Sequence, residues 1–205
     1  MPDLRTALKQ CPVVAILRGV KPDEVDAVGD ALVEAGITII EVPLNSPDPF
    51  DSIGRLAKRH GTRALIGAGT VLETLDVARV KDAGGQLIVA PNFDADVVRV
   101  SKAAGLVALP GVMTPSEGFA ALKAGADGLK LFPAEIIPPT VFKAWRAVFP
   151  ADTLLLAVGG VGVDNIRSYA VAGAAGYGIG SALYKPGRPA ADIGTLARAL
   201  VTSLS

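Results

Sequence analysis

Short apolar runs recur along the chain, and each is followed by a stretch in which apolar residues return every three or four positions. The runs are almost continuously apolar and do not alternate, which is typical of parallel strands buried on both faces. Their starts lie 19 to 27 residues apart, enough for a strand, a loop and a helix of two to three turns. The predicted strands occupy residues 13–19, 37–44, 64–71, 86–92, 105–112, 128–134, 153–161 and 176–183.

Eight strand–helix units predict an α/β fold, a single (β/α)8 TIM-type barrel over residues 1–205. Several intervening segments start with Asp, Pro or Ser and end in Gly, as capped helices do. The alternative is a doubly wound open sheet. Its dinucleotide fingerprint is absent, because GAGTVL at 67–72 lacks the third glycine.

Composition restricts the function further. The chain of 205 residues is 50% hydrophobic and has 20 basic and 20 acidic residues, so a large core forms and no net charge favours nucleic acid or an anionic membrane. The single cysteine, Cys11, cannot form an internal disulfide, and no Cys/His pair has metal-ligand spacing. Because the sequence has neither a signal-peptide pattern nor a membrane-length apolar run, we expect a cytoplasmic protein. Because it has no metal-ligand spacing, we expect it to need no metal, and we expect no other cofactor.

The candidate chemistry lies where strands end, because active sites of such barrels form at the C-terminal ends of the strands. Lys130 lies inside the sixth predicted strand, between Leu129 and Leu131. Neighbouring side chains of a strand point in opposite directions, so Lys130 points into the barrel if the two leucines face the helices. Glu41 has the corresponding position in the second strand.

The second and sixth strands face each other across a ring of eight, so Lys130 and Glu41 could both contact one small molecule. One interpretation is a buried ion pair that fixes the barrel, although such pairs often give no net stability. The other is a lysine nucleophile with an acid–base partner, since burial lowers the pKa of a lysine and frees its amine to attack a carbonyl. We favour the second interpretation.

The last two strands end in glycines, at Gly159-Gly160 and at Gly180-Ser181. Backbone N–H groups at these two strand ends commonly hold phosphate in barrels, although glycine pairs also serve plain turns. At the end of the first strand, Arg18 can hold a carboxylate or a phosphate, or can simply open a surface loop. His60 precedes a helix-ending glycine and is interpreted as structural.

The motifs together resemble one family, the class I 2-keto-3-deoxy-6-phosphosugar-acid aldolases. The resemblance covers almost the whole chain in order, and it rests on Arg18, EVPLNSP (41–47), IGAGTVL (66–72), IVAPN (88–92), PGVMTPSE (110–117), LKLFPAE (129–135), AVGGV (157–161) and GIGSALY (178–184). It implies that Lys130 forms a Schiff base and that Glu41 shuttles protons. It also implies cleavage of a phosphorylated keto acid to pyruvate and glyceraldehyde 3-phosphate, and a homotrimer.

The resemblance also implies the substrate contacts. The residues concerned are Arg18, Thr70, Pro91, Phe132, Val158, Gly159, Gly160, Gly180 and Ser181. Of these, Gly160, Gly180 and Ser181 would lie near the phosphate, while Pro91 and Phe132 would shape the pocket around the pyruvyl part. Thr70 can equally be an ordinary strand-end hydroxyl.

Two positions separate this chain from the gluconate-type members of the family. Asn45 stands where they carry Arg, and Val158 stands where they carry Thr. Both departures match the galactonate-type branch, and a hydroxyl-to-methyl change predicts a preference and not an absolute bar. The alternatives are a gluconate-type aldolase, a phosphate-binding barrel isomerase, epimerase or synthase, and a non-catalytic binder of a sugar or flavin phosphate.

Overall fold

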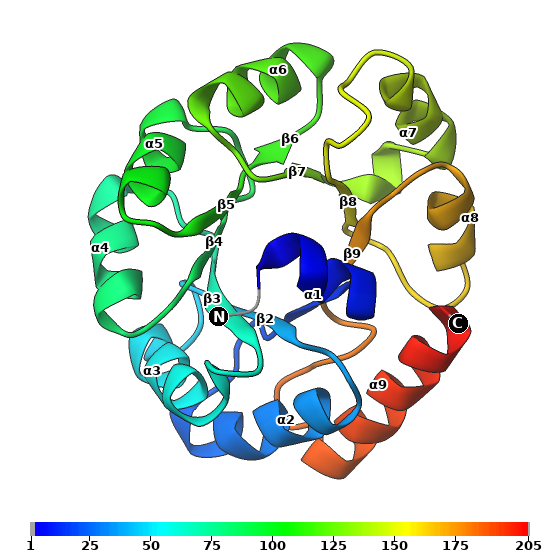
Figure 1. Ribbon diagram of the computed structural model, residues 1–205. Coiled ribbons are helices and arrows are strands. Elements are labelled where there is room, and N and C mark those ends of the chain that lie inside the picture. The colour runs from blue at the N-terminus through cyan, green and yellow to red at the C-terminus, as the bar shows by residue number, and fades with distance from the viewer. Residues whose placement is uncertain (1–2, 205) are drawn as a thin grey trace.

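The computed structural model describes residues 3–204, and it contains a parallel barrel surrounded by a ring of helices (Figure 1). Each strand pair is parallel, with regular register, as the apolar runs predict. The barrel fold predicted from the sequence is therefore confirmed. The prediction of one domain over residues 1–205 includes residues 1, 2 and 205, which lie outside the described residues, and it stays a prediction.

The strands follow the eight predicted runs closely. They are β1 (Val13–Ile16), β2 (Ile39–Pro43), β3 (Leu65–Gly69), β4 (Leu87–Val89), β5 (Val107–Leu109), β6 (Gly111–Val112), β7 (Leu129–Leu131), β8 (Leu155–Val158) and β9 (Gly176–Ile179). The helices are α1 (Leu4–Gln10), α2 (Pro22–Glu34), α3 (Pro49–His60), α4 (Thr74–Asp82), α5 (Ala95–Ala103), α6 (Pro115–Ala124), α7 (Pro139–Arg146), α8 (Ile166–Val171) and α9 (Ala190–Leu204), with a 3-10 turn η1 (Ala134–Ile136).

The fifth predicted strand is divided in two by Pro110, which has no N–H to donate to a neighbouring strand. The strand order is β5-β4-β3-β2-β1-β9-β8-β7-β6, so β5 and β6 are the two edges of the sheet. Because these two strands are consecutive in the chain, the backbone itself joins the edges. The N–H of Lys130 donates to the carbonyl of Pro110 at 2.9 Å and helps to close the ring.

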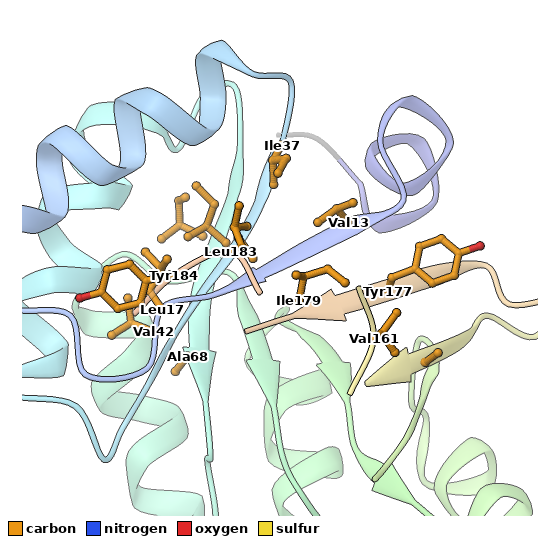
Figure 2. Packing of buried hydrophobic residues seen from close by; sticks show 14 of the residues in the cluster. Val13, Leu17, Ile37, Val42, Ala68, Val161, Tyr177, Ile179, Leu183 and Tyr184 are labelled. Atoms are coloured by element: carbon orange, nitrogen blue, oxygen red, sulfur yellow. The ribbon is translucent and has the colours of Figure 1, made fainter. Parts of the chain in front are cut away.

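Along each strand, side chains point alternately towards the surrounding helices and towards the barrel interior. The helix side holds a large buried cluster that includes Val13, Val42 and Ile179, and Figure 2 shows part of it. The interior holds a second cluster that includes Val14 and Ile39. This alternation decides which polar side chains enter the barrel.

Helix α1 covers the N-terminal end of the barrel. Its residues Leu4, Ala7 and Leu8 are buried in the interior cluster, and in Figure 1 the helix lies within the ring formed by the other helices. A Cβ atom at Gly176, the first residue of β9, would lie 2.8 Å from Leu8, so the helix and the strand are in close contact. The interior is therefore blocked at this end, and a site must open at the other.

Among residues 3–204, no helix combines the length and the apolar character that crossing a membrane requires.

Candidate active site

Lys130 lies in the barrel interior, as the pattern of β7 predicts. Leu129 and Leu131 are fully buried in the cluster on the helix side, whereas Lys130 lines a cavity and is 6% exposed. Its Nζ lies 4.6 Å from the ring centroid of Phe132, close enough for a cation–π contact. Burial, and the positive charge of Arg18, lower the pKa of Lys130, although Glu41 acts in the opposite direction. A larger share of neutral amine follows.

Glu41 occupies the interior side of β2 by the same alternation. Its neighbours Ile40 and Val42 belong to the helix-side cluster, and its own side chain is 2% exposed. The carboxyl group lies against Gly69, where a Cβ atom would overlap both of its oxygens. Burial raises the pKa of Glu41 to about 7 despite the nearby charges of Lys130 and Arg18. The group can therefore both donate and accept a proton near neutral pH.

Glu41 and Lys130 lie on opposite walls of the barrel. The path from β2 to β7 passes through β1, β9 and β8, which is half of the ring. The ion pairs found in residues 3–204 do not include one between these two side chains, and Oε2 of Glu41 is buried without a protein hydrogen-bond partner in that range. An ion pair that fixes the barrel is therefore not what the geometry supports.

A cavity of about 670 Å³ opens at the C-terminal end of the barrel, a volume typical of small-molecule sites. It brings together most of the side chains and glycines expected from the sequence. They are Arg18, Lys130, Phe132, Val158, Gly159, Gly160, Gly180 and Ser181.

Three of the expected residues do not line this cavity. Glu41 is buried deeper in the barrel, against Gly69. Thr70 follows directly, with a positive φ of 55°, a conformation that costs energy for a β-branched residue. Pro91 lies beside Gly111, where a Cβ atom would meet its carbonyl group. The substrate contacts of Thr70 and Pro91 stay predictions.

The glycine turns expose backbone N–H groups at the cavity mouth. Gly159 and Gly160 have φ values of 102° and 64°, which only glycine adopts easily. Asn165 fixes this turn, since its Nδ2 donates to the carbonyl of Gly160 at 2.8 Å. Within residues 3–204, the N–H groups of Gly160 and Ser181 donate to no protein acceptor, so both are available to an anionic ligand.

The structure adds one contact between expected residues, and three further residues that the sequence prediction did not assign to the site. Arg18 Nη1 donates to Oδ1 of Asn45 at 2.7 Å, so Asn45 orients the arginine. Glu135 lies over the glycine turn, and its Oε2 would be 2.5 Å from a Cβ atom at Gly159. Lys185 also lines the cavity, directly after the motif GIGSALY. The role of Asn165 has no signal in the sequence, because it depends on how the turn folds.

Residues 3–204 contain no group of three or more His, Cys, Asp or Glu side chains arranged to hold a metal ion.

The barrel and its cavity are those of an α/β-barrel enzyme of the aldolase class, and residues 4–193 match the profile of the KDPG and KHG aldolase family. The chain belongs to this family. It is thus an aldolase, a lyase, as the sequence motifs predict.

Individual relatives agree with this assignment. The chain is 51% identical over 182 residues to the probable 2-dehydro-3-deoxy-6-phosphogalactonate aldolase of Rhizobium meliloti (strain 1021), covering 89% of this chain and 86% of the relative. It is 45% identical to 2-dehydro-3-deoxy-6-phosphogalactonate aldolase of Escherichia coli (strain K12), covering 86% of each. A solved structure described as native KDPGal superimposes with a TM-score of 0.93 at 42% identity, covering 95% of both chains.

Proposed function

We propose that this protein is a class I aldolase that cleaves 2-dehydro-3-deoxy-6-phospho-D-galactonate reversibly to pyruvate and D-glyceraldehyde 3-phosphate. The observation that carries the proposal is the buried Lys130 opposite the buried Glu41, below a cavity whose mouth offers free N–H groups of Gly160 and Ser181. The activity named for the relatives that are 51% and 45% identical supports the choice of substrate.

The reaction begins at Lys130. Its neutral amine attacks the C2 ketone, and loss of water leaves a protonated imine that accepts an electron pair. Glu41 supplies the proton that leaves with the water. Because burial lowers the pKa of Lys130, a larger fraction of the amine is neutral before substrate binds than for an exposed lysine.

Cleavage of the C3–C4 bond follows. Glu41, directly or through water, removes the C4 hydroxyl proton while the bonding electrons move to the imine nitrogen and form an enamine. Glyceraldehyde 3-phosphate leaves, C3 of the enamine takes a proton, and hydrolysis of the resulting imine releases pyruvate. A carboxyl group with a pKa of about 7 suits these opposite transfers.

The remaining contacts distribute the substrate over the cavity. Arg18, held by Asn45 at 2.7 Å, would bind the carboxylate of the substrate. Gly160, Gly180 and Ser181 would hold the phosphate at the mouth. Pro91 and Phe132 would shape the space around the pyruvyl part, and Thr70 would add a hydroxyl contact.

Val158 lines the cavity next to the glycine turn and would face the C4 region, where the galactonate- and gluconate-derived substrates differ. A methyl group there offers no hydrogen bond to a C4 hydroxyl. We therefore expect a preference for the galactonate-derived epimer, measured as the ratio of kcat/KM for the two epimers, with weaker cleavage of the other.

The proposal extends to assembly and location. The family resemblance supports a homotrimer, which analytical ultracentrifugation would detect. The single cysteine, Cys11, supports a reducing, cytoplasmic location.

Borohydride trapping tests the proposed Schiff base. The protein is incubated with pyruvate, reduced with borohydride and digested, and peptide mass spectrometry should locate a reduced pyruvyl adduct on Lys130. The variant Lys130→Ala should lose both the adduct and turnover, whereas the exposed Lys143→Ala on α7 should keep both.

Circular dichroism of Lys130→Ala verifies that the barrel still folds. Substantial turnover by the folded Lys130→Ala protein, or an adduct confined to another lysine, would refute the assignment.

A further inference from the structure

The charges around the cavity do not balance those of the proposed substrate. A phosphate monoester carries nearly two negative charges at neutral pH, and the cavity lining already includes the carboxylates of Glu135 and Asp164. Of the cations, Lys130 is committed to the reacting C2 carbon, and Arg18, held by Asn45, is assigned to the substrate carboxylate. Among the described residues that line the cavity, Lys185 is the remaining cation.

The backbone before Lys185 is firmly held next to the proposed phosphate-binding turn. The N–H groups of Leu183 and Tyr184 both donate to the carbonyl of Gly180 at 2.9 Å. The Tyr184 side chain is buried, and its hydroxyl donates to Oε1 of Glu24 at the start of α2, at 2.7 Å. Lys185 is thus fixed one turn away from Gly180 and Ser181.

The backbone after Lys185 is also held. Pro186 packs on the loop that carries Arg18, since a Cβ atom at Gly19 would lie 2.9 Å from its ring. A proline also restricts the backbone of the residue before it. The N–H of Arg188 donates to the carbonyl of Lys185 at 3.0 Å. The backbone of Lys185 therefore has little freedom.

The side chain of Lys185, by contrast, is exposed at the cavity mouth. Within residues 3–204 its ammonium group has no hydrogen-bond or ion-pair partner. A lysine ammonium is a compact charge with three donors and a common phosphate ligand. A rigid backbone and an ammonium group with no protein partner among the described residues together suit the binding of an anion.

We propose that Lys185 binds the phosphate group of the substrate and supplies the counter-charge that the N–H groups of Gly160 and Ser181 lack. This inference rests on the proposed function. With this role, Lys185 in the loop after β9 would give the enzyme its preference for phosphorylated over unphosphorylated substrates.

Lys185→Met tests the inference, because it keeps the length of the side chain and removes the charge. KM for the phosphorylated keto acid should rise roughly 10- to 100-fold with kcat little changed, the effect of losing one charged hydrogen bond. Exchange of the C3 protons of pyruvate with deuterated solvent, which needs no phosphate, should be unchanged. Lys185→Arg should recover most of the affinity, and Lys143→Met on α7 serves as the matched control.

An unchanged KM in Lys185→Met would overturn the inference, and so would an equal loss of pyruvate exchange, because the variant would then affect more than the phosphate. Failure of the proposed function has a different signature, namely wild-type protein that neither exchanges pyruvate protons nor cleaves the keto acid. In that case, the affinity for inorganic phosphate, measured by calorimetry, tests the role of Lys185 independently of catalysis. Weaker binding by Lys185→Met than by the wild type supports the inference, and equal binding overturns it.

Discussion

At the scale of single residues, burial sets the protonation of both central groups. An apolar environment disfavours the charged form of each, so the pKa of Lys130 falls and that of Glu41 rises to about 7. Gly69 makes the second shift possible, because the carboxyl group occupies the space that a Cβ atom would fill. Glu41 is thereby kept out of water, close to the neutral pH at which it would work.

This placement of Glu41 should cost stability as pH rises. A pKa raised from 4.5 to about 7 means that the folded protein keeps a proton that the unfolded chain has already lost. The resulting stabilisation is present below about pH 4.5 and disappears as pH rises through about 7, a change of about 3 kcal/mol. The glutamine of Glu41→Gln does not titrate. As pH rises from about 4.5 to above 7, the free energy of unfolding of this variant should therefore increase by about 3 kcal/mol relative to that of the wild type.

Urea unfolding at several pH values measures the difference, with the exposed Glu34→Gln on α2 as the control. Turnover by Glu41→Gln should fall by roughly 10² to 10⁴. Parallel stability profiles for the wild type and Glu41→Gln would contradict the raised pKa, and unchanged turnover would exclude Glu41 as the proton shuttle.

At the scale of elements, a buried histidine joins α2 and α3. His60 is 1% exposed, and its Nε2 lies 3.1 Å from Oδ1 of Asp30, which also binds Arg59. Gly29 gives the two helices room, since a Cβ atom there would lie 2.5 Å from Leu56. His60 is therefore structural, as interpreted from the sequence, but its ring packs between two helices and is not a cation on the surface. Burial lowers the pKa of His60, and Asp30 opposes the shift.

His60 should make the protein less stable in acid. A lowered pKa favours the neutral ring in the folded state, so its contribution is present above the unfolded value of 6.5 and is lost as pH falls below it. His60 is the only histidine in the chain, which makes the effect separable. Unfolding free energies of the wild type and His60→Gln should converge on acidification; a constant difference between about pH 7.5 and 5.5 would contradict this.

The strands were predictable because each apolar run of a parallel sheet is long, buried on both faces and bounded by turn residues. The sequence prediction did not identify α1, which precedes the first strand. Seven-residue α1 has too few turns for a clear period, and its Leu4 and Leu8 are buried only because the end of the barrel is there to receive them. Pro110 divides β5 from β6 because tertiary hydrogen bonding, and not the apolar pattern, decides where a strand ends.

The candidate site was predictable in part for a similar reason. Strand alternation is local, so it placed Lys130 and Glu41 inside the barrel from the sequence alone. Which loop residues reach the cavity depends on contacts between distant segments. Lys185 is brought there by the bond from Tyr184 to Glu24, 160 residues apart in the chain, and no local pattern encodes such a contact.

At the scale of the whole molecule, the two ends of the barrel differ. Helix α1 lies within the ring of the other helices (Figure 1), and its residues Leu4 and Leu8 fill the N-terminal end. The cavity lined by Lys130 opens at the C-terminal end. The glycine turns and Lys185 lie around this opening. Each reactant must therefore pass the proposed phosphate-binding residues on its way to or from the amine.

A blind-ended barrel makes the order of arrival matter when the enzyme runs towards carbon–carbon bond formation. An aldehyde phosphate that settles on Gly160 and Ser181 first would obstruct the route of pyruvate to Lys130. Initial rates at low pyruvate should therefore pass through a maximum and then decline as the aldehyde concentration rises, and additional pyruvate should remove the decline. Simple saturation by the aldehyde at every pyruvate concentration would count against such a dead-end complex. If the dead-end complex forms, the rate of synthesis depends on the ratio of aldehyde to pyruvate as well as on their concentrations.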